Sequence, residues 1–167
     1  LPWRATARAA LLPAARAFSG ASLMGAQQRS KGARFERDVA KRLFAELGIT
    51  FKRDLSQYQQ SDRGDLTPDN PAFPFLIECK TRASGADCLA AWEAQAHTAA
   101  KAVGLRACVI YKIGTQPIRC RIGIDAIVAA HGGTAVTTDV ADLPIPAFAY
   151  VARELMARQA EKEQWKC

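Results

Sequence analysis

The chain has 167 residues, of which 49% are hydrophobic and 23% charged, and its 23 basic against 16 acidic side chains give a net charge of +7. The length and composition are those of one globular domain, which argues against a wholly disordered chain and against two packed domains. Because the apolar runs, such as those at 73–77 and 126–130, are far shorter than the roughly 20 residues that cross a bilayer, we expect a soluble protein without a membrane partner.

The positive charge and the cysteines narrow the class of partner. Residues 31–121 are the basic section, whereas the section after them is slightly acidic. Such an excess of positive charge favours a polyanion as the binding partner, because phosphates that are neutralised by the protein release their counterions. A basic surface that only faces solvent would have the same composition. The five cysteines include no CxxC pair, which argues against a zinc ribbon and favours a reducing compartment.

Residues 1–29 are predicted to be a leader or disordered extension ahead of a single domain at 30–167. They are rich in Ala and Arg, contain no acid and do not begin with Met. This composition is typical of a mitochondrial transit peptide, but we favour an overextended gene start, with Met24 as the first methionine. We therefore expect a bacterial or phage-encoded cytoplasmic protein, with mitochondrial import if the leader is real.

From residue 30 onward the pattern predicts helices alternating with short strands. Ser30 is expected to cap a helix whose apolar residues recur every four positions, and Gly48 is placed to end it. A polar loop at 55–63 and a proline-rich turn at 67–74 separate the first strands. The expected elements are a helix from Ser30 to residue 47, strands at 49–53, 65–66 and 75–81, a helix at 87–103, strands at 106–113 and 118–124, a short helix capped by Asp125 and ending at Gly132, and a C-terminal helix at 147–165.

Three charged residues stand out by their context. Glu78 and Lys80 lie two positions apart on one strand and so point to the same face, which taken alone fits an ordinary ion pair. Asp65 opens the neighbouring strand, and two adjacent carboxylates repel unless a cation or proton lies between them. Mg²⁺ binds through one or two carboxylates together with water and phosphate oxygens, which suits phosphodiester hydrolysis. Lys80 would then hold the attacking water or offset transition-state charge.

These motifs resemble the PD-(D/E)xK nuclease superfamily, and within it the archaeal-type Holliday junction resolvases and related phage endonucleases. The segments that carry the resemblance are KGARFER at 31–37, RGDL at 63–66 and FLIECK at 75–80. The resemblance implies an α/β (α+β) fold with a restriction-endonuclease-like core, in which helices flank a mixed central sheet in the order α-β-β-β-α-β. The departure from the pattern is Gly64, which stands where the name-giving proline would be and does no chemistry.

The resemblance also assigns roles to residues of the site. Asp65, Glu78 and the backbone carbonyl of Cys79 are expected to bind Mg²⁺, for which Mn²⁺ would substitute. Lys80 would assist the water, and Glu36 would complete the acidic cluster as a further ligand. Gln95, on the following helix, is expected to face the site. The expected DNA-binding residues are Arg34, Arg53, Ser56, Gln57, Arg63 and Arg82, with Lys112, Arg119 and Arg121 as further candidate phosphate contacts.

The function predicted from this resemblance is a Mg²⁺-dependent DNA endonuclease that resolves Holliday junctions or other branched DNA in recombination and repair. A homodimer is expected, because a symmetric four-way junction needs two coordinated nicks. Two alternatives stay open, because a fold and a metal site do not dictate the substrate. One is a restriction-like or RecB-like nuclease on linear DNA, and the other is a non-catalytic DNA-binding module.

Overall fold

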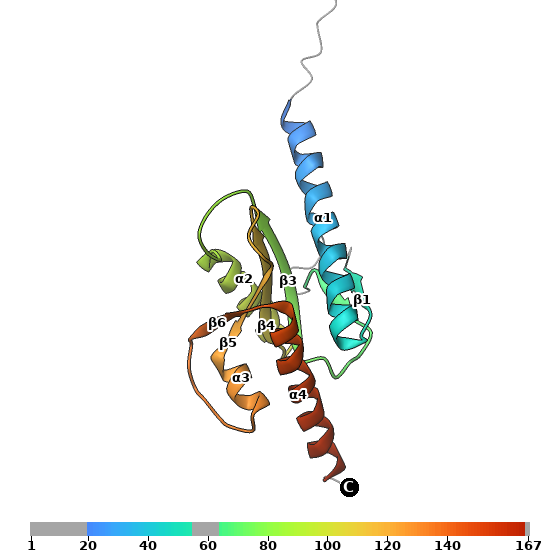
Figure 1. Ribbon diagram of the computed structural model, residues 1–167, viewed down its shortest axis with the longest axis vertical. Coiled ribbons are helices and arrows are strands. Elements are labelled where there is room, and N and C mark those ends of the chain that lie inside the picture. Colours follow the sequence, from blue (N-terminus) through green and yellow to red (C-terminus); the bar gives the residue numbers. More distant parts are fainter. Residues whose placement is uncertain (1–19, 55–63, 166–167) are drawn as a thin grey trace, which may run out of the picture.

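The computed structural model describes residues 20–54 and 64–165, which form a mixed sheet with helices on both faces (Figure 1). The order α1-β1-β2-β3-α2-β4 confirms the predicted core. The elements are α1 (Gly20–Leu47), β1 (Phe51–Arg53), β2 (Leu66–Pro68), β3 (Phe75–Arg82), α2 (Ala90–Ala102), β4 (Arg106–Ile113), β5 (Arg119–Gly123), α3 (Ile124–Ala130), β6 (Val140–Leu143) and α4 (Ile145–Gln164).

The strands lie in the sheet in the order in which they occur in the chain, from β1 to β6. β3 and β4 are parallel, and the other neighbouring pairs are antiparallel. The parallel pair needs a crossover, which α2 supplies. The predicted α/β class with a mixed central sheet is therefore confirmed.

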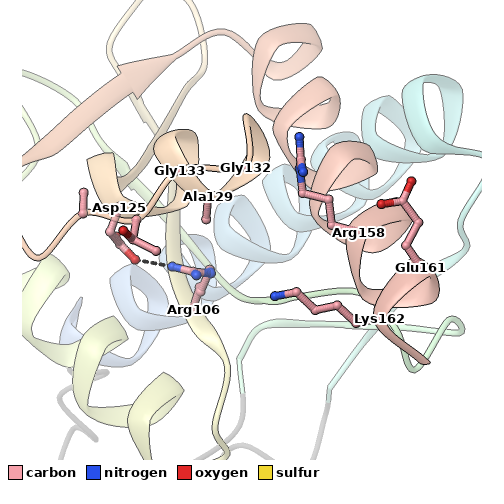
Figure 2. Close-up of a pocket in the computed structure, with 10 residues that line it drawn as sticks. Arg106, Asp125, Ala129, Gly132, Gly133, Arg158, Glu161 and Lys162 are labelled. Carbon is pink, nitrogen blue, oxygen red and sulfur yellow. Dashed lines mark hydrogen bonds and ion pairs between the residues drawn. The ribbon is translucent and has the colours of Figure 1, made fainter. Parts of the chain in front are cut away.

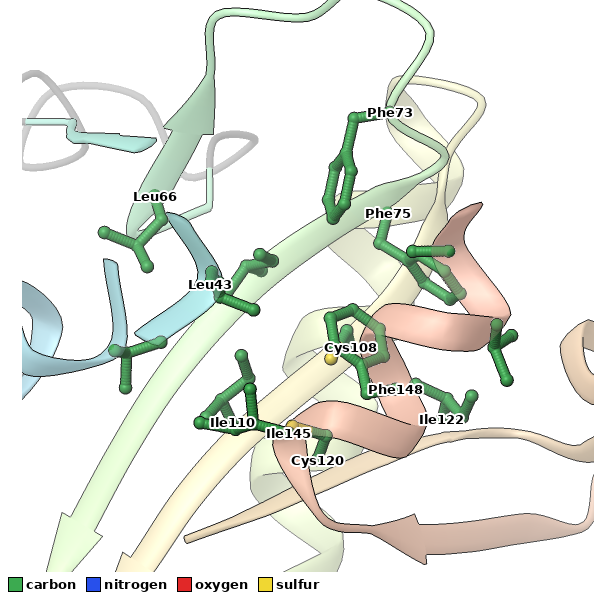
Figure 3. Close-up of a cluster of buried hydrophobic side chains, with 14 of the residues drawn as sticks. Leu43, Leu66, Phe73, Phe75, Cys108, Ile110, Cys120, Ile122, Ile145 and Phe148 are labelled. Atoms are coloured by element: carbon green, nitrogen blue, oxygen red, sulfur yellow. The ribbon is translucent and has the colours of Figure 1, made fainter. Parts of the chain in front are cut away.

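The sheet separates two hydrophobic cores. The larger one lies between the sheet and helices α1, α3 and α4, and Figure 3 shows Phe75 and Cys108 of the sheet beside Phe148 of α4. The rings of Phe75 and Phe148 meet edge to face with centroids 5.0 Å apart. The smaller core lies under α2, where Leu76 and Val109 pack against alanines. Because odd-numbered residues of β3 enter the first core, its even-numbered residues face α2.

Helix α1 begins at Gly20, so the prediction that Ser30 caps it is wrong. The stretch before residue 30 lacks an apolar stripe, but it contains no proline after residue 13 and is rich in Ala, which favours helix. The helix thus extends well beyond the sheet at its N-terminal end (Figure 1). Its predicted end is confirmed: Gly48 has φ of +68° and its N–H bonds to the carbonyl of Phe44.

The C-terminal third departs most from expectation. β6 was not predicted, because its four residues VADL contain an acid and lie half-buried at the sheet edge. Gly123, and not Asp125, is the N-cap of α3, and Asp125 instead pairs with Arg106. Helix α4 begins at Ile145 because proline is well tolerated in a first turn. Among the described residues no helix has the length and apolar character needed to span a membrane.

Candidate active site

Asp65 and Glu78 are brought together where β2 meets β3. The two strands pair at Leu66 and Ile77, which both enter the larger core. Asp65 precedes Leu66, and Glu78 follows Ile77. Because the strands are antiparallel, these two residues lie beside each other on the opposite face. The backbone N–H of Asp65 also donates to the carbonyl of Ile77 at 2.8 Å. The paired carboxylates predicted from strand alternation are thus adjacent in the fold.

Both carboxylates are almost completely removed from solvent, with exposed fractions of 7% for Asp65 and 3% for Glu78. Burial, and after it the neighbouring charge of Asp65, raises the pKa of Glu78 to about 7, although Lys80 acts in the opposite direction. Near neutral pH the pair is therefore about as stable with a proton on Glu78 as with both carboxylates ionised. A cation placed between the two groups would displace that proton.

Cys79 contributes its backbone to this site and not its side chain. Its N–H donates to Oδ2 of Asp65 at 2.6 Å, which fixes that carboxylate against β3. In an extended strand the N–H and C=O of one residue point to the same edge, so the carbonyl of Cys79 also faces the Asp65 side. The thiol has a pKa raised well above its usual value by burial and by Asp65, and it therefore stays protonated.

Lys80 joins the carboxylate pair to helix α2. Its Nζ lies 3.2 Å from Oε2 of Glu78 and donates to Oε1 of Gln95 at 3.1 Å. An ammonium has three donor hydrogens, so one remains for a water molecule or a phosphate oxygen. The structure thereby brings together four of the predicted residues: Asp65, Glu78, Lys80 and Gln95.

Glu36 approaches from the other side of the sheet, on α1. It is buried, with 9% exposed, and its Oε2 accepts a hydrogen bond from Nε of Arg53. The described residues contain no group of three or more His, Cys, Asp or Glu side chains arranged to hold a metal ion. The role of Glu36 as a further ligand that completes the acidic cluster therefore stays a prediction. Arg53, a predicted DNA contact, is engaged with Glu36.

The structure explains why Gly64 stands where the superfamily pattern has proline. A Cβ at Gly64 would lie 2.5 Å from the carbonyl oxygen of Ile77, a backbone atom of β3. A proline or any other side chain at this position would push β2 away from β3. Gly64 therefore allows the close approach that sets Asp65 beside Glu78.

A basic groove of about 550 Å³ begins one residue beyond Lys80, between α1 and the ends of β3 and β4. Four cationic side chains line it against one acid: Lys31, Arg34, Arg82 and Lys112 against Asp38. Arg34, Arg82 and Lys112 were predicted from the sequence as DNA or phosphate contacts. Lys31 was not, although its place three residues before Arg34 on a helix puts both on one side.

The remaining predicted contacts divide into three groups. Arg119 is exposed on β5 and does not line the groove. Ser56, Gln57 and Arg63 lie outside the described residues. Arg121 is paired with three carboxylates and not with the groove, a cluster that sequence reasoning missed because one of its acids, Asp142, belongs to the unpredicted β6.

A second cavity lies away from these residues, near the start of β4 (Figure 2). It has a volume of about 400 Å³, and Figure 2 shows Arg106 bonded to Asp125 on one side with Arg158 and Lys162 of α4 on the other. None of the predicted site residues lines it. The carboxylate pair and the basic groove, and not this cavity, therefore form the candidate active site.

The donor set of the candidate site fits a hard divalent cation. Asp65 and Glu78 supply carboxylate oxygens and Cys79 supplies a carbonyl oxygen, which are the ligand types of Mg²⁺. Two carboxylates are also the usual protein contribution to a Mg²⁺ site that shares its ion with a phosphate. The neighbouring thiol is protonated and faces the other way, so the set does not favour a soft metal.

Comparison with known proteins gives a family match and a similar solved structure. A family model described as "Phage putative PDDEXK endonuclease" matches residues 27–142, which include all the described residues of the candidate site. Among solved structures, the chain is similar to Hjc, a Holliday junction resolvase from Archaeoglobus fulgidus, with 21% identity and a TM-score of 0.46 over 73% of this chain and 98% of that chain. No curated protein matches the chain.

Proposed function

The chain belongs to the family of phage PDDEXK endonucleases, and from this premise we propose that it is a Mg²⁺-dependent endonuclease that hydrolyses phosphodiester bonds in branched DNA, with the Holliday junction as its substrate. The observation that carries the metal dependence is the buried pair of Asp65 and Glu78 beside Lys80. Mn²⁺ would substitute for Mg²⁺, because it accepts the same oxygen ligands.

The proposed division of labour follows from the atoms around this pair. Asp65, Glu78 and the carbonyl of Cys79 would hold the cation, which when bound supplies an acidified water molecule and neutralises charge on the phosphate. The N–H of Cys79 keeps the Asp65 carboxylate in place. Lys80, oriented by Glu78 and Gln95, would donate its third hydrogen to the attacking water or to a phosphate oxygen.

The basic groove supports DNA as the ligand. Its lining carries a net positive charge and includes Thr81 and Arg82, the two residues that follow Lys80 on β3, so a strand whose phosphates lie in it would run close to Lys80 along β3. The guanidinium of Arg82 lies over the ring of Trp92, at 5.9 Å from the centroid, and its buried Nε has no hydrogen-bond partner among the described residues. A buried donor without a partner costs free energy, and a phosphate oxygen or a water molecule would satisfy it.

The preference for branched DNA rests on the resemblance of the three sequence motifs to the junction resolvases. A homodimer follows from that preference, because the two nicks of a symmetric junction need two sites related by a two-fold axis. Linear duplex DNA is the competing substrate, because the same carboxylate pair and groove serve either one.

The deciding experiment is cleavage by the full chain of a four-way junction, a linear duplex and a single strand, with Mg²⁺ and with EDTA. Paired nicks in the junction alone, lost in EDTA and in Lys80→Ala, would support the proposal. The matched control is Lys101→Ala, which removes an exposed lysine of α2 outside the site. Cleavage of linear DNA would keep the mechanism and change the substrate, whereas DNA binding without cleavage would favour the non-catalytic module.

A further inference from the structure

Arg121 of β5 is a nearly buried arginine, 12% exposed, that contacts carboxylates from three separate segments. Its guanidinium donates two hydrogen bonds to Asp142 of β6, at 2.9 and 2.5 Å, and one to Asp87 before α2, at 2.6 Å. Glu93 within α2 lies 3.5 Å from it, and the ring of Tyr111 lies 5.9 Å from the guanidinium carbon. Three carboxylates more than neutralise one guanidinium, so this residue is not available to a phosphate.

Helix α2 needs such an anchor, because its own sequence gives it little to pack with. Its buried side chains are Ala96, Ala99 and Ala100, and its N-cap, Leu89, makes no side-chain capping bond. Alanine buries little apolar area, and the hydrophobic contribution to docking is correspondingly small. Trp92 in the first turn is partly buried against the smaller core, and the polar contacts from the sheet add to it in placing the first turns of α2.

Glu93 and Gln95 fasten opposite sides of this helix. Two residues are about 200° apart around a helix axis, so Glu93 reaches Arg121 of β5 while Gln95 reaches Lys80 of β3. The strand register sets the spacing between the two anchors. Glu78 pairs with Val109, and Val109 pairs with Arg121, which places Arg121 two strands, or roughly 10 Å, from the catalytic carboxylate.

We propose that Arg121 is a positioning residue of the nuclease: by holding Glu93 and Asp87, it fixes α2 over the sheet and so keeps Gln95 on Lys80. The inference rests on the proposed function only for its effect on cleavage. Without Arg121, α2 loses the ion pairs that fix it over β5, so Gln95 can move away from Lys80, and Lys80 then lacks the acceptor that orients its third hydrogen.

The test is a double-mutant cycle in the cleavage assay of the full chain. Arg121→Gln is expected to lower the cleavage rate about tenfold, because small misplacements of catalytic groups cost much of their effect. In a Gln95→Ala background the same substitution is expected to lower the cleavage rate less than about twofold, because the hydrogen bond through which Arg121 would act on Lys80 is already absent. Equal losses in both backgrounds would overturn the proposal. Glu93→Ala, which leaves the Arg121–Asp142 pair intact, repeats the cycle if Arg121→Gln does not fold.

A second readout separates this inference from the proposed function. Hydrogen exchange of the α2 amides and the NMR signal of the Gln95 side-chain amide are measured in wild type, Arg121→Gln and Glu93→Ala. Faster exchange over α2 with unchanged exchange over β4, together with a shifted Gln95 signal, is expected. The control is Arg106→Gln, which removes an ion pair between β4 and α3. Unchanged α2 exchange would overturn the inference even if the protein cleaves DNA, whereas a wild type that cleaves nothing would refute the proposed function alone.

Discussion

Replacing Glu78 with glutamine is expected to stabilise the metal-free protein at alkaline pH. Burial and the charge of Asp65 raise the pKa of this carboxyl from 4.5 to about 7. Above pH 7 the ionised form therefore costs the fold up to about 3 kcal/mol, since each pKa unit corresponds to about 1.4 kcal/mol. Glutamine carries no charge, but it also deprives Lys80 of an ionic partner, so we expect a net gain of about 1–3 kcal/mol at pH 8.

The sign of the pH dependence follows from the direction of the shift. Between pH 4.5 and 7 the folded state holds the Glu78 proton more tightly than the unfolded chain does, so wild-type stability falls as the pH rises through this window. Glu78→Gln lacks this loss. The difference in unfolding free energy between variant and wild type is therefore expected to grow from pH 5 to pH 8 and then to level off.

The assay is urea unfolding of the full chain in EDTA at pH 5, 6, 7 and 8. Contributions of groups that do not interact with Glu78 cancel in the difference between variant and wild type, and Glu161→Gln on the exposed part of α4 controls for the amide itself. A difference that does not change with pH, or a variant less stable than wild type at pH 8, would refute the account of Glu78 as a buried, proton-sharing carboxylate.

Three further results are expected. Several millimolar Mn²⁺ at pH 8 should raise the melting temperature of wild type by mass action and leave that of Glu78→Gln unchanged, and no shift in wild type would count against the metal site. Gly64→Ala should destabilise the fold by about 1–3 kcal/mol in urea unfolding, because its Cβ would meet the backbone of β3 at 2.5 Å; a loss below about 0.5 kcal/mol would mean that β2 adjusts freely. The double variant Lys31→Gln/Lys112→Gln should weaken DNA binding about tenfold and lower the slope of log affinity against log salt by about 2, with Lys41→Gln as control; an unchanged slope would remove the groove from the DNA path.

The part of the site that could be predicted from the sequence is the part that depends on the alternation of side chains along a strand. A period of two was enough to set Glu78 and Lys80 on one face, and the fold confirms the order of the core elements around them. The resemblance to phage endonucleases is likewise confirmed by the family model. The adjacency of Gln95 and Lys80 in the structure follows from a crossover helix that must lie over the strands it connects.

What could not be predicted depends on contacts between distant segments. The start of α1 was missed because its first turns lack an apolar stripe, and β6 was missed because a half-buried edge strand has no alternation to read. The pairing of Glu36 with Arg53 requires the register of β1 against α1, which no local pattern encodes. The same holds for the three acids around Arg121.

One row of paired residues explains how a lightly packed helix can serve a site that demands accurate placement. The row crosses the sheet from Glu78 through Val109 to Arg121 and Asp142. Backbone hydrogen bonds set the spacing along this row, so the carboxylate and the arginine that anchors α2 keep a constant separation. Groups held by strands are placed more accurately than groups held by loops. On the proposal made for Arg121, Gln95 owes its position to the sheet, through the ion pair of Glu93, as well as to Trp92 and the alanines of its own helix.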